Sequence, residues 1–140
     1  MEYKKLDKYH YIIRIDKGEE IVSSLNDFCN WEDVKLGSLN GLGIASKIIL
    51  SQYDITKKEF IEKTYEGSFE INNLMANITK KEGRNVVNAH INFSDTDFNS
   101  HGGKLVECTV GATCEIVITV ITGTINRRND DFYDISILDI

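Results

Sequence analysis

Proline is absent from the 140-residue sequence, although it makes up about 5% of an average protein. Turns must therefore be built from glycine, asparagine and aspartate, which tolerate left-handed backbone or bond their own backbone. The sequence also has no internal repeat, no low-complexity tract and no linker. Its length suits one domain over residues 1–140 with a single hydrophobic core.

Cysteine is scarce, and long hydrophobic runs are missing. Cys29, Cys108 and Cys114 are odd in number and lack CxxC spacing, so we expect reduced thiols that pack as small buried hydrophobic groups. The best apolar run, 116–121, is interrupted by Thr119 and is far shorter than the roughly 18 residues of a membrane span. The N-terminal residues lack the apolar stretch of a signal peptide. These absences predict a cytoplasmic protein that does not enter a membrane.

Positive charge is in the minority. The formal net charge is −6 at pH 7, and only four residues are arginine, which excludes a general attraction to phosphate backbones or anionic lipid. The Arg-Arg pair at 127–128 is followed by Asn129 and two aspartates, so we interpret it as a solvated turn. One local exception is the small basic patch formed by Lys80, Lys81 and Arg84. We expect DNA to be bound only weakly or indirectly.

One segment has the pattern of a helix. Asp16 and Glu19 match a capping box, with Asp16 as the N-cap and Glu19 three residues later. Apolar residues then recur at helical spacing, at Ile21, Leu25, Phe28 and Cys29. The pattern predicts a helix over 18–29.

The rest of the chain has the pattern of strands. The predicted strands are 9–15, 34–40, 45–53, 59–65, 69–79, 85–93, 105–109, 114–122 and 132–140. We expect a hairpin turn at 66–68, a turn or bulge at 41–43, and a connection around Gly111. Many strands with one early helix predict an α+β domain built on a mixed, mainly antiparallel sheet.

His90 lies on the polar face of the predicted strand 85–93, between Asn88 and Asn92. Neutral imidazole binds metals and titrates near neutral pH, so His90 is a candidate metal ligand or acid-base group. The alternative is a solvated histidine, or one that is hydrogen-bonded at a subunit contact.

The segment from His101 to Lys104 contains Gly102 and Gly103 and is predicted to be a turn. Such a turn would return the chain beside His90, so that Asn88, His90 and Lys104 share one polar pocket. The full candidate ligand-binding set is Asn88, His90, Gly102, Gly103, Lys104 and Glu107. The ammonium of Lys104 would suit a small anion such as a carboxylate or phosphate. The alternative is that Lys104 forms a salt bridge with Glu107 or Glu70.

Several short motifs fall in one order along the chain. They are Gly-Leu-Gly-Ile-Ala at 41–45, Tyr-Asp at 53–54, Phe-Glu-Ile at 69–71, Ala-Asn-Ile at 76–78, Asn-Ala-His at 88–90, Gly-Gly-Lys-Leu at 102–105, Cys-Glu-Ile at 114–116 and Arg127. In this order they resemble the PPC (plant- and prokaryote-conserved) domain, over about residues 9–140. The resemblance implies one helix packed on an antiparallel sheet, and a homotrimer. It also implies a fold similar to that of acetolactate decarboxylase, a zinc enzyme.

The chain departs from the family at the residues that carry its chemistry. The family often has His-x-His on the strand and a third histidine in Gly-Gly-His-Leu. In this chain these three positions, which we call the seats, are Asn88, His90 and Lys104. Asparagine is a poor zinc ligand and a charged lysine opposes a cation, so we expect no zinc and no other cofactor. His101 is the one nearby histidine that could take the third seat.

The family also carries a DNA-binding label. In plants the domain accompanies AT-hooks that bind A·T-rich DNA, but this chain has neither Arg-Gly-Arg nor proline. We therefore expect a homotrimeric module that acts through assembly or regulation rather than direct base readout. The alternative is a small-ligand- or metal-binding enzyme that uses His90 with Lys104, Glu107 or Glu70.

Overall fold

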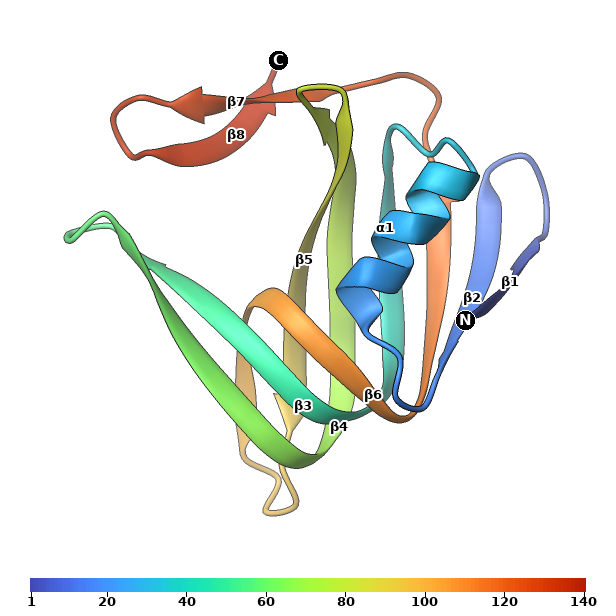
Figure 1. Cartoon of the computed structure of the whole chain (residues 1–140), viewed down its shortest axis with the longest axis vertical. Coiled ribbons are helices and arrows are strands. Elements are labelled where there is room, and N and C mark those ends of the chain that lie inside the picture. The colour runs from blue at the N-terminus through green and yellow to red at the C-terminus, as the bar shows by residue number, and fades with distance from the viewer.

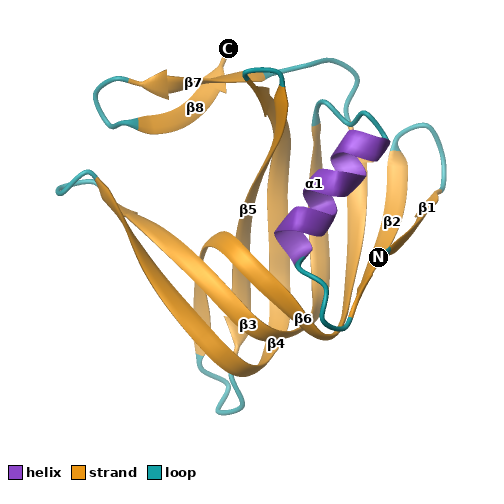
Figure 2. Cartoon of the chain, in the orientation of Figure 1, coloured by secondary structure: helices purple, strands orange, loops and turns teal.

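The computed structural model describes all residues from 1 to 140 as one continuous eight-stranded sheet with a single helix against it (Figures 1 and 2). The elements are β1 (Glu2–Lys5), β2 (His10–Asp16), α1 (Ile21–Trp31), β3 (Gly37–Asp54), β4 (Glu59–Lys81), β5 (Arg84–Ser94), β6 (Ser100–Val120), β7 (Asn126–Asp130) and β8 (Ile135–Asp139). The prediction of a mixed, mainly antiparallel sheet with one principal helix is confirmed. The only helix has 11 residues and is not long and apolar enough to span a membrane.

The strand order is β1-β2-β6-β3-β4-β7-β8, and β5 pairs with both β4 and β6. All pairings are antiparallel except a single parallel one, between Lys80 of β4 and Asn126 of β7. Strands β3, β4, β5 and β6 therefore form a closed circuit of pairings. Figure 1 shows β3, β4 and β6 curling sharply as they pass from one part of this circuit to the other.

The curl comes from bulges in the long strands. In β3 the register shifts between Gly41 and Gly43 and again between Ala45 and Lys47. A Cβ at Gly43 would lie 2.4 Å from the Thr113 carbonyl oxygen, so only glycine permits this approach. The predicted bulge at 41–43 is confirmed, and the segments 34–40 and 45–53 belong to one continuous strand from Gly37 onward.

The predicted hairpin turn at 66–68 is wrong, because β4 runs without a break from Glu59 to Lys81. Gly67 has a φ of +147° and lies opposite the β3 bulge, where Ala45 pairs with Phe69 and Lys47 with Glu66. The turn-like residues therefore bend one strand instead of reversing the chain. Strand β3 lies beside both halves of β4, so the hydrogen-bonded pairing of the two strands continues across the bend.

The predicted turn at His101–Lys104 is also wrong. These residues lie inside β6, which continues through Gly111 to Val120. The chain reverses earlier, where Asp95 Oδ1 accepts hydrogen bonds from the backbone N–H groups of Asp97 and Asn99 at 3.0 and 2.9 Å. The Asp95 side chain stabilises this chain reversal by hydrogen bonds to the backbone of its own loop, so the turn needs no glycine.

The helix begins at Ile21, three residues later than the predicted start at residue 18. Gly18 adopts a left-handed φ of +88°, which completes a separate turn in which the Glu19 carboxylate accepts from the Asp16 N–H. Glu20 is the actual N-cap, because its carboxylate accepts from the N–H groups of Val22 and Ser23. The predicted apolar face is confirmed: Ile21, Leu25, Phe28 and Cys29 are all buried.

The C-terminal segment is a hairpin rather than the single predicted strand 132–140. Residues 131–134 form the turn between β7 and β8, with Asp134 at a φ of +54°. The arginine pair at 127–128, interpreted above as a solvated turn, lies in β7. Because β7 is added beside β4, Arg127 Nε donates to Thr79 Oγ1 at 2.8 Å.

Helix α1 covers one face of the sheet, where 26 buried hydrophobic residues form one cluster. The three cysteines are free and buried in this cluster, as expected. The opposite face has no helix over it. Four large apolar side chains on neighbouring strands are exposed there, and we call them the open face: Ile12, Leu42, Met75 and Val117.

Candidate functional site

The three seats at Asn88, His90 and Lys104 lie on one side of the sheet, facing away from the core. His90 of β5 pairs directly with Lys104 of β6 and, on its other edge, with Met75 of β4. Asn88 lies two residues from His90, so both side chains point to the same face, while the intervening Ala89 is buried. Directly opposed residues in an antiparallel pair have Cβ atoms about 4.5–5.5 Å apart. The register therefore places His90 and Lys104 side by side at the level of the backbone, with Asn88 on the same face, but the Lys104 ammonium is directed across β3 to Phe60, on the other side of β6 from His90.

The electrostatics of the site follow from this pairing. Partial burial, and then the positive charge of Lys104, lower the pKa of His90 below its usual 6.5. His90 is therefore neutral at physiological pH, with one ring nitrogen as a donor and the other as an acceptor.

Lys104 forms no ion pair. Its Nζ lies 5.1 Å from the centroid of the Phe60 ring on β4. Glu107, one of the two proposed salt-bridge partners, pairs with Lys47 at 2.8 Å instead, and Glu70 forms no ion pair. Among the predicted site residues, Glu107 is thus engaged elsewhere.

Gly102 and Gly103 serve strand packing rather than a turn. Gly102 pairs with Asn92, and a Cβ at Gly102 would lie 2.5 Å from the Asn92 side-chain amide. Gly103 pairs with the buried Ile91, and its Cβ would meet Leu50 at 3.4 Å. The glycine at 102 therefore makes room for the Asn92 amide beside the seats.

His101 lies on the other side of β6 and does not reach the third seat. It pairs with the buried Phe93, and its ring centroid lies 5.1 Å from that of Tyr65. Its Nε2 is 3.0 Å from Asp95 Oδ2. The hydrogen bond from His101, followed by those from the loop backbone and Asn99, lowers the pKa of Asp95 to about 2. Our reasoning from the sequence missed this pair, although both residues flank one polar loop.

The lowered pKa of Asp95 predicts that the stability of the folded protein depends on pH. A carboxylate with a depressed pKa stabilises the fold fully above its unfolded value of 3.8, and this contribution disappears as the pH falls toward about 2. We expect Asp95→Asn to lower the melting temperature at neutral pH, and the gap to the original protein to close on acidification through that interval. Thermal melts across this pH range measure the gap. Asp97→Asn in the same loop is the control and should leave the melting curve unchanged at every pH.

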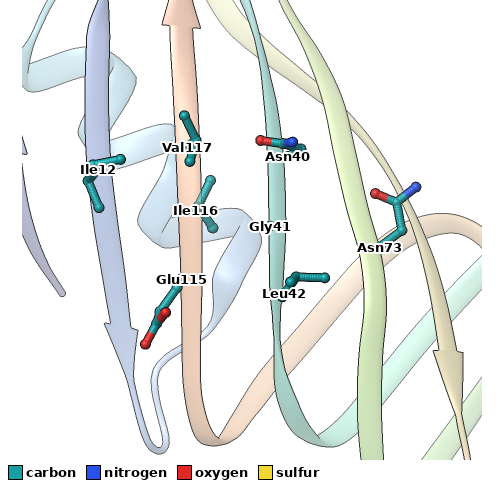
Figure 3. A pocket seen from close by; sticks show the side chains of 8 residues that line it. All are labelled: Ile12, Asn40, Gly41, Leu42, Asn73, Glu115, Ile116 and Val117. Carbon is teal, nitrogen blue, oxygen red and sulfur yellow. The ribbon is translucent and has the colours of Figure 1, made fainter.

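Shallow hollows follow the open face toward His90. The largest, of about 470 Å³, is lined by Ile12, Asn40, Gly41, Leu42, Asn73, Glu115, Ile116 and Val117 (Figure 3). A second of about 430 Å³ shares Asn40, Asn73 and Val117 and adds Met75. A third of about 190 Å³ is lined by Met75, Ala76, Asn77, Asn88 and His90. These hollows form a trough along the open face that leads to Asn88 and His90, whereas Lys104 lines none of them. Sequence periodicity alone did not reveal this trough.

The seats do not fit a zinc ion. Zinc sites in proteins use at least three nitrogen, sulfur or carboxylate ligands, and here one imidazole remains, with a lysine as its cross-strand neighbour. No group of three or more His, Cys, Asp or Glu side chains in the protein is placed to hold a metal ion.

The structure resembles several solved proteins. A putative DNA-binding protein from Bacteroides thetaiotaomicron matches with a TM-score of 0.95 and 28% identity, covering 99% of this chain and 96% of that one. A putative DNA-binding protein from Ralstonia eutropha matches with a TM-score of 0.90 and 29% identity, covering 99% and 95%. A plant- and prokaryote-conserved (PPC) protein from Pyrococcus horikoshii matches with a TM-score of 0.86 and 25% identity, covering 94% and 91%.

More distant likeness concerns the fold alone. Acetolactate decarboxylase from Bacillus subtilis matches with a TM-score of 0.56 and 14% identity, covering 87% of this chain and 57% of that one. A search of curated proteins finds no match. A family model for the Plants and Prokaryotes Conserved (PCC) domain matches residues 4–122. Because this match spans most of the chain and agrees with the motifs in the sequence, the chain belongs to the PCC domain family.

Proposed function

We propose that this chain is the protomer of a homotrimer that acts as an assembly or regulatory module. The observation that carries the proposal is the open face. Leu42 and Met75 are 61% and 55% exposed, and Ile12 and Val117 on the adjoining strands are 38% and 43% exposed. Contiguous apolar patches on soluble proteins mark interaction sites more often than chance.

The composition of the open face favours another copy of the same chain as its partner. The polar residues between the apolar ones, Asn40, Asn73 and Asn77, are uncharged. Each protomer carries a net charge of −6, so a contact surface with few charges limits the like-charge repulsion between two copies. Interface centres are depleted of charged residues in the same way. Glu115 is the charged exception in the lining of the largest hollow, and it lies opposite Arg14 in the register of β2 and β6.

The molecular mass in solution tests the trimer. We expect size-exclusion chromatography with light scattering, at micromolar concentration and without a tag, to give three times the 15.9 kDa of the chain. A monomer mass under these conditions would overturn the proposal. A dimer would show that the open face associates with different symmetry and would overturn the trimer specifically.

Direct DNA binding is not part of the proposed function, although two structural relatives are described as putative DNA-binding proteins. Within the basic patch, Lys81 Nζ donates to Asn129 Oδ1 at 2.7 Å, while Lys80 and Arg84 form no ion pair. Phosphate binding needs several cations that neutralise the backbone, and this patch stands in a chain of net charge −6. The proposal therefore assigns regulation to assembly.

We therefore predict no sub-micromolar affinity for A·T-rich duplex DNA at about 150 mM salt, where the Debye length is about 8 Å. Fluorescence anisotropy with a labelled duplex measures this, and a titration at low salt shows how far any binding is nonspecific. A tight complex that weakens steeply with salt, and disappears when Lys80, Lys81 and Arg84 become glutamine, would contradict the prediction.

A further inference from the structure

We infer that a hollow of about 180 Å³ between the end of β3, the start of β4 and β6 binds a small monocarboxylate through Lys63. We call it the arm hollow, because the β3–β4 hairpin leaves the rest of the sheet there as a projecting arm (Figure 1). Its lining residues are Leu50, Ser51, Gln52, Ile61, Lys63, Tyr65 and Gly102. None of them belongs to the open face, so the inference does not depend on the trimer.

The arm hollow lies where two strands part. Strand β3 pairs with β6 as far as Ser51 and Lys104, whereas its pairing with β4 continues to Asp54. The residues of β6 before Lys104 pair with β5 on one edge and with no strand on the other. Gly102 lies on this uncovered part of β6 and lines the hollow. The fork between the arm and β6 therefore leaves room for a ligand.

The side chains that line the hollow share one face of the arm. Leu50 lies directly opposite Lys63 in the pairing of β3 and β4, and Gln52 lies opposite Ile61. Because alternate strand residues point to the same side, Ile61, Lys63 and Tyr65 lie in a row along β4. The Lys63 ammonium lies 4.8 Å from the centroid of the Tyr65 ring, which itself lines the hollow. The positive charge is therefore placed at the hollow.

The charge of Lys63 has no partner within the protein. The chain has 22 acidic and 16 basic residues, yet no ion pair includes this lysine. Glu59 shares its face of β4 but lies about 13 Å away along the strand, and it is 4.0 Å from Lys57. Asp95 accepts from His101 and from its own loop instead. The ammonium is therefore available to an anionic ligand.

Two neutral donors lie beside this charge. The hydroxyl of Tyr65 and the side-chain amide of Gln52 line the hollow and form no hydrogen bond within the protein. A carboxylate accepts through two oxygens, so it can bond to the ammonium and to a neutral donor at once.

Packing holds the tyrosine ring in place before a ligand arrives. The centroid of the Tyr65 ring lies 5.1 Å from those of Phe93 and His101. Phe93 is buried, and the His101 ring is fixed in turn by its hydrogen bond to Asp95. A side chain that is already ordered loses little conformational freedom on binding. The Tyr65 hydroxyl is therefore a preorganised donor.

Charge and shape together select the class of anion. One ammonium supplies a single positive charge, which matches a carboxylate better than a phosphate carrying about −1.5 to −2 charges. Leu50 and Ile61 add an apolar wall for a hydrocarbon stem. The volume is below the roughly 300–1,000 Å³ of pockets for drug-sized ligands. The combination suits a short aliphatic acid.

Two-dimensional NMR of the intact, untagged protein tests the inference. Sodium butyrate is the probe, sodium formate and inorganic phosphate are the comparisons, and sodium chloride holds the ionic strength constant. We expect saturable shifts of the backbone amide signals of Gln52, Lys63 and Gly102 with butyrate, and weaker binding of formate and of phosphate. We expect Lys63→Gln to weaken butyrate binding about tenfold or more, as loss of a charge-assisted hydrogen bond predicts.

Lys8→Gln is the matched control. Lys8 is also exposed, lies 5.3 Å from the centroid of an aromatic ring, that of Tyr9, and forms no ion pair, but it is not part of the arm hollow. We expect this variant to leave butyrate binding unchanged. Absence of saturable binding, equal weakening by both lysine variants, or binding of formate or phosphate at least as tight as that of butyrate would overturn the inference.

Discussion

Leu42→Lys is expected to convert the proposed trimer into a monomer of 15.9 kDa. Leu42 is 61% exposed on the single chain and lines the same hollow as Ile12 and Val117 (Figure 3). In the trimer the substitution would bury an unpaired ammonium in each protomer, and an uncompensated buried charge costs about 3–5 kcal/mol. Light scattering at micromolar concentration measures the change in mass, and circular dichroism verifies that the sheet is retained.

Trp31→Lys is the matched control for this experiment. Trp31 is 64% exposed and lies at the end of α1, on the side of the sheet opposite the open face. We expect this variant to keep the mass of the original protein. If Trp31→Lys dissociates the assembly and Leu42→Lys does not, the interface lies on the helix side and our assignment of the open face is wrong.

The double variant Asn88→His with Lys104→His is expected to gain zinc. It would place three imidazoles on one face, two across a strand pair and two at alternate positions on β5. Three imidazoles are a sufficient protein ligand set for zinc. We expect the original protein to retain no stoichiometric zinc, and the double variant to retain about one ion per chain. Metal analysis of tag-free protein, followed by competition with a chelator, measures both.

The single variant Asn88→His distinguishes the effect of the number of imidazole ligands on zinc affinity from the effect of the Lys104 charge. This variant has two imidazoles but keeps the Lys104 ammonium, so we expect it to bind zinc at least about 100-fold more weakly than the double variant. Stoichiometric zinc in the original protein that is lost with His90→Ala would contradict the charge argument. A double variant without zinc would show that the three positions do not converge closely enough for a common ligand.

Local sequence pattern determined the elements with an uninterrupted period. The alternation across 85–93 correctly predicted β5 and the face that His90 shares with Asn88, because successive strand side chains point to opposite sides. The apolar spacing of α1 likewise identified its buried face. The ordered motifs identified the family, and the sequence alone shows Lys104 where the family often has its third histidine.

Tertiary structure decided the features that depend on distant partners. Glu66-Gly67-Ser68 has turn chemistry, but pairing with β3 extends the strand through it. His101 was a plausible third ligand in the sequence, and its register opposite Phe93 sends it to the other face. Lys104 could have paired with Glu107, but Lys47 on β3 takes that carboxylate. Local propensities act within a few residues, whereas strand register, and with it the partner of each charge, is set by burial of the whole core.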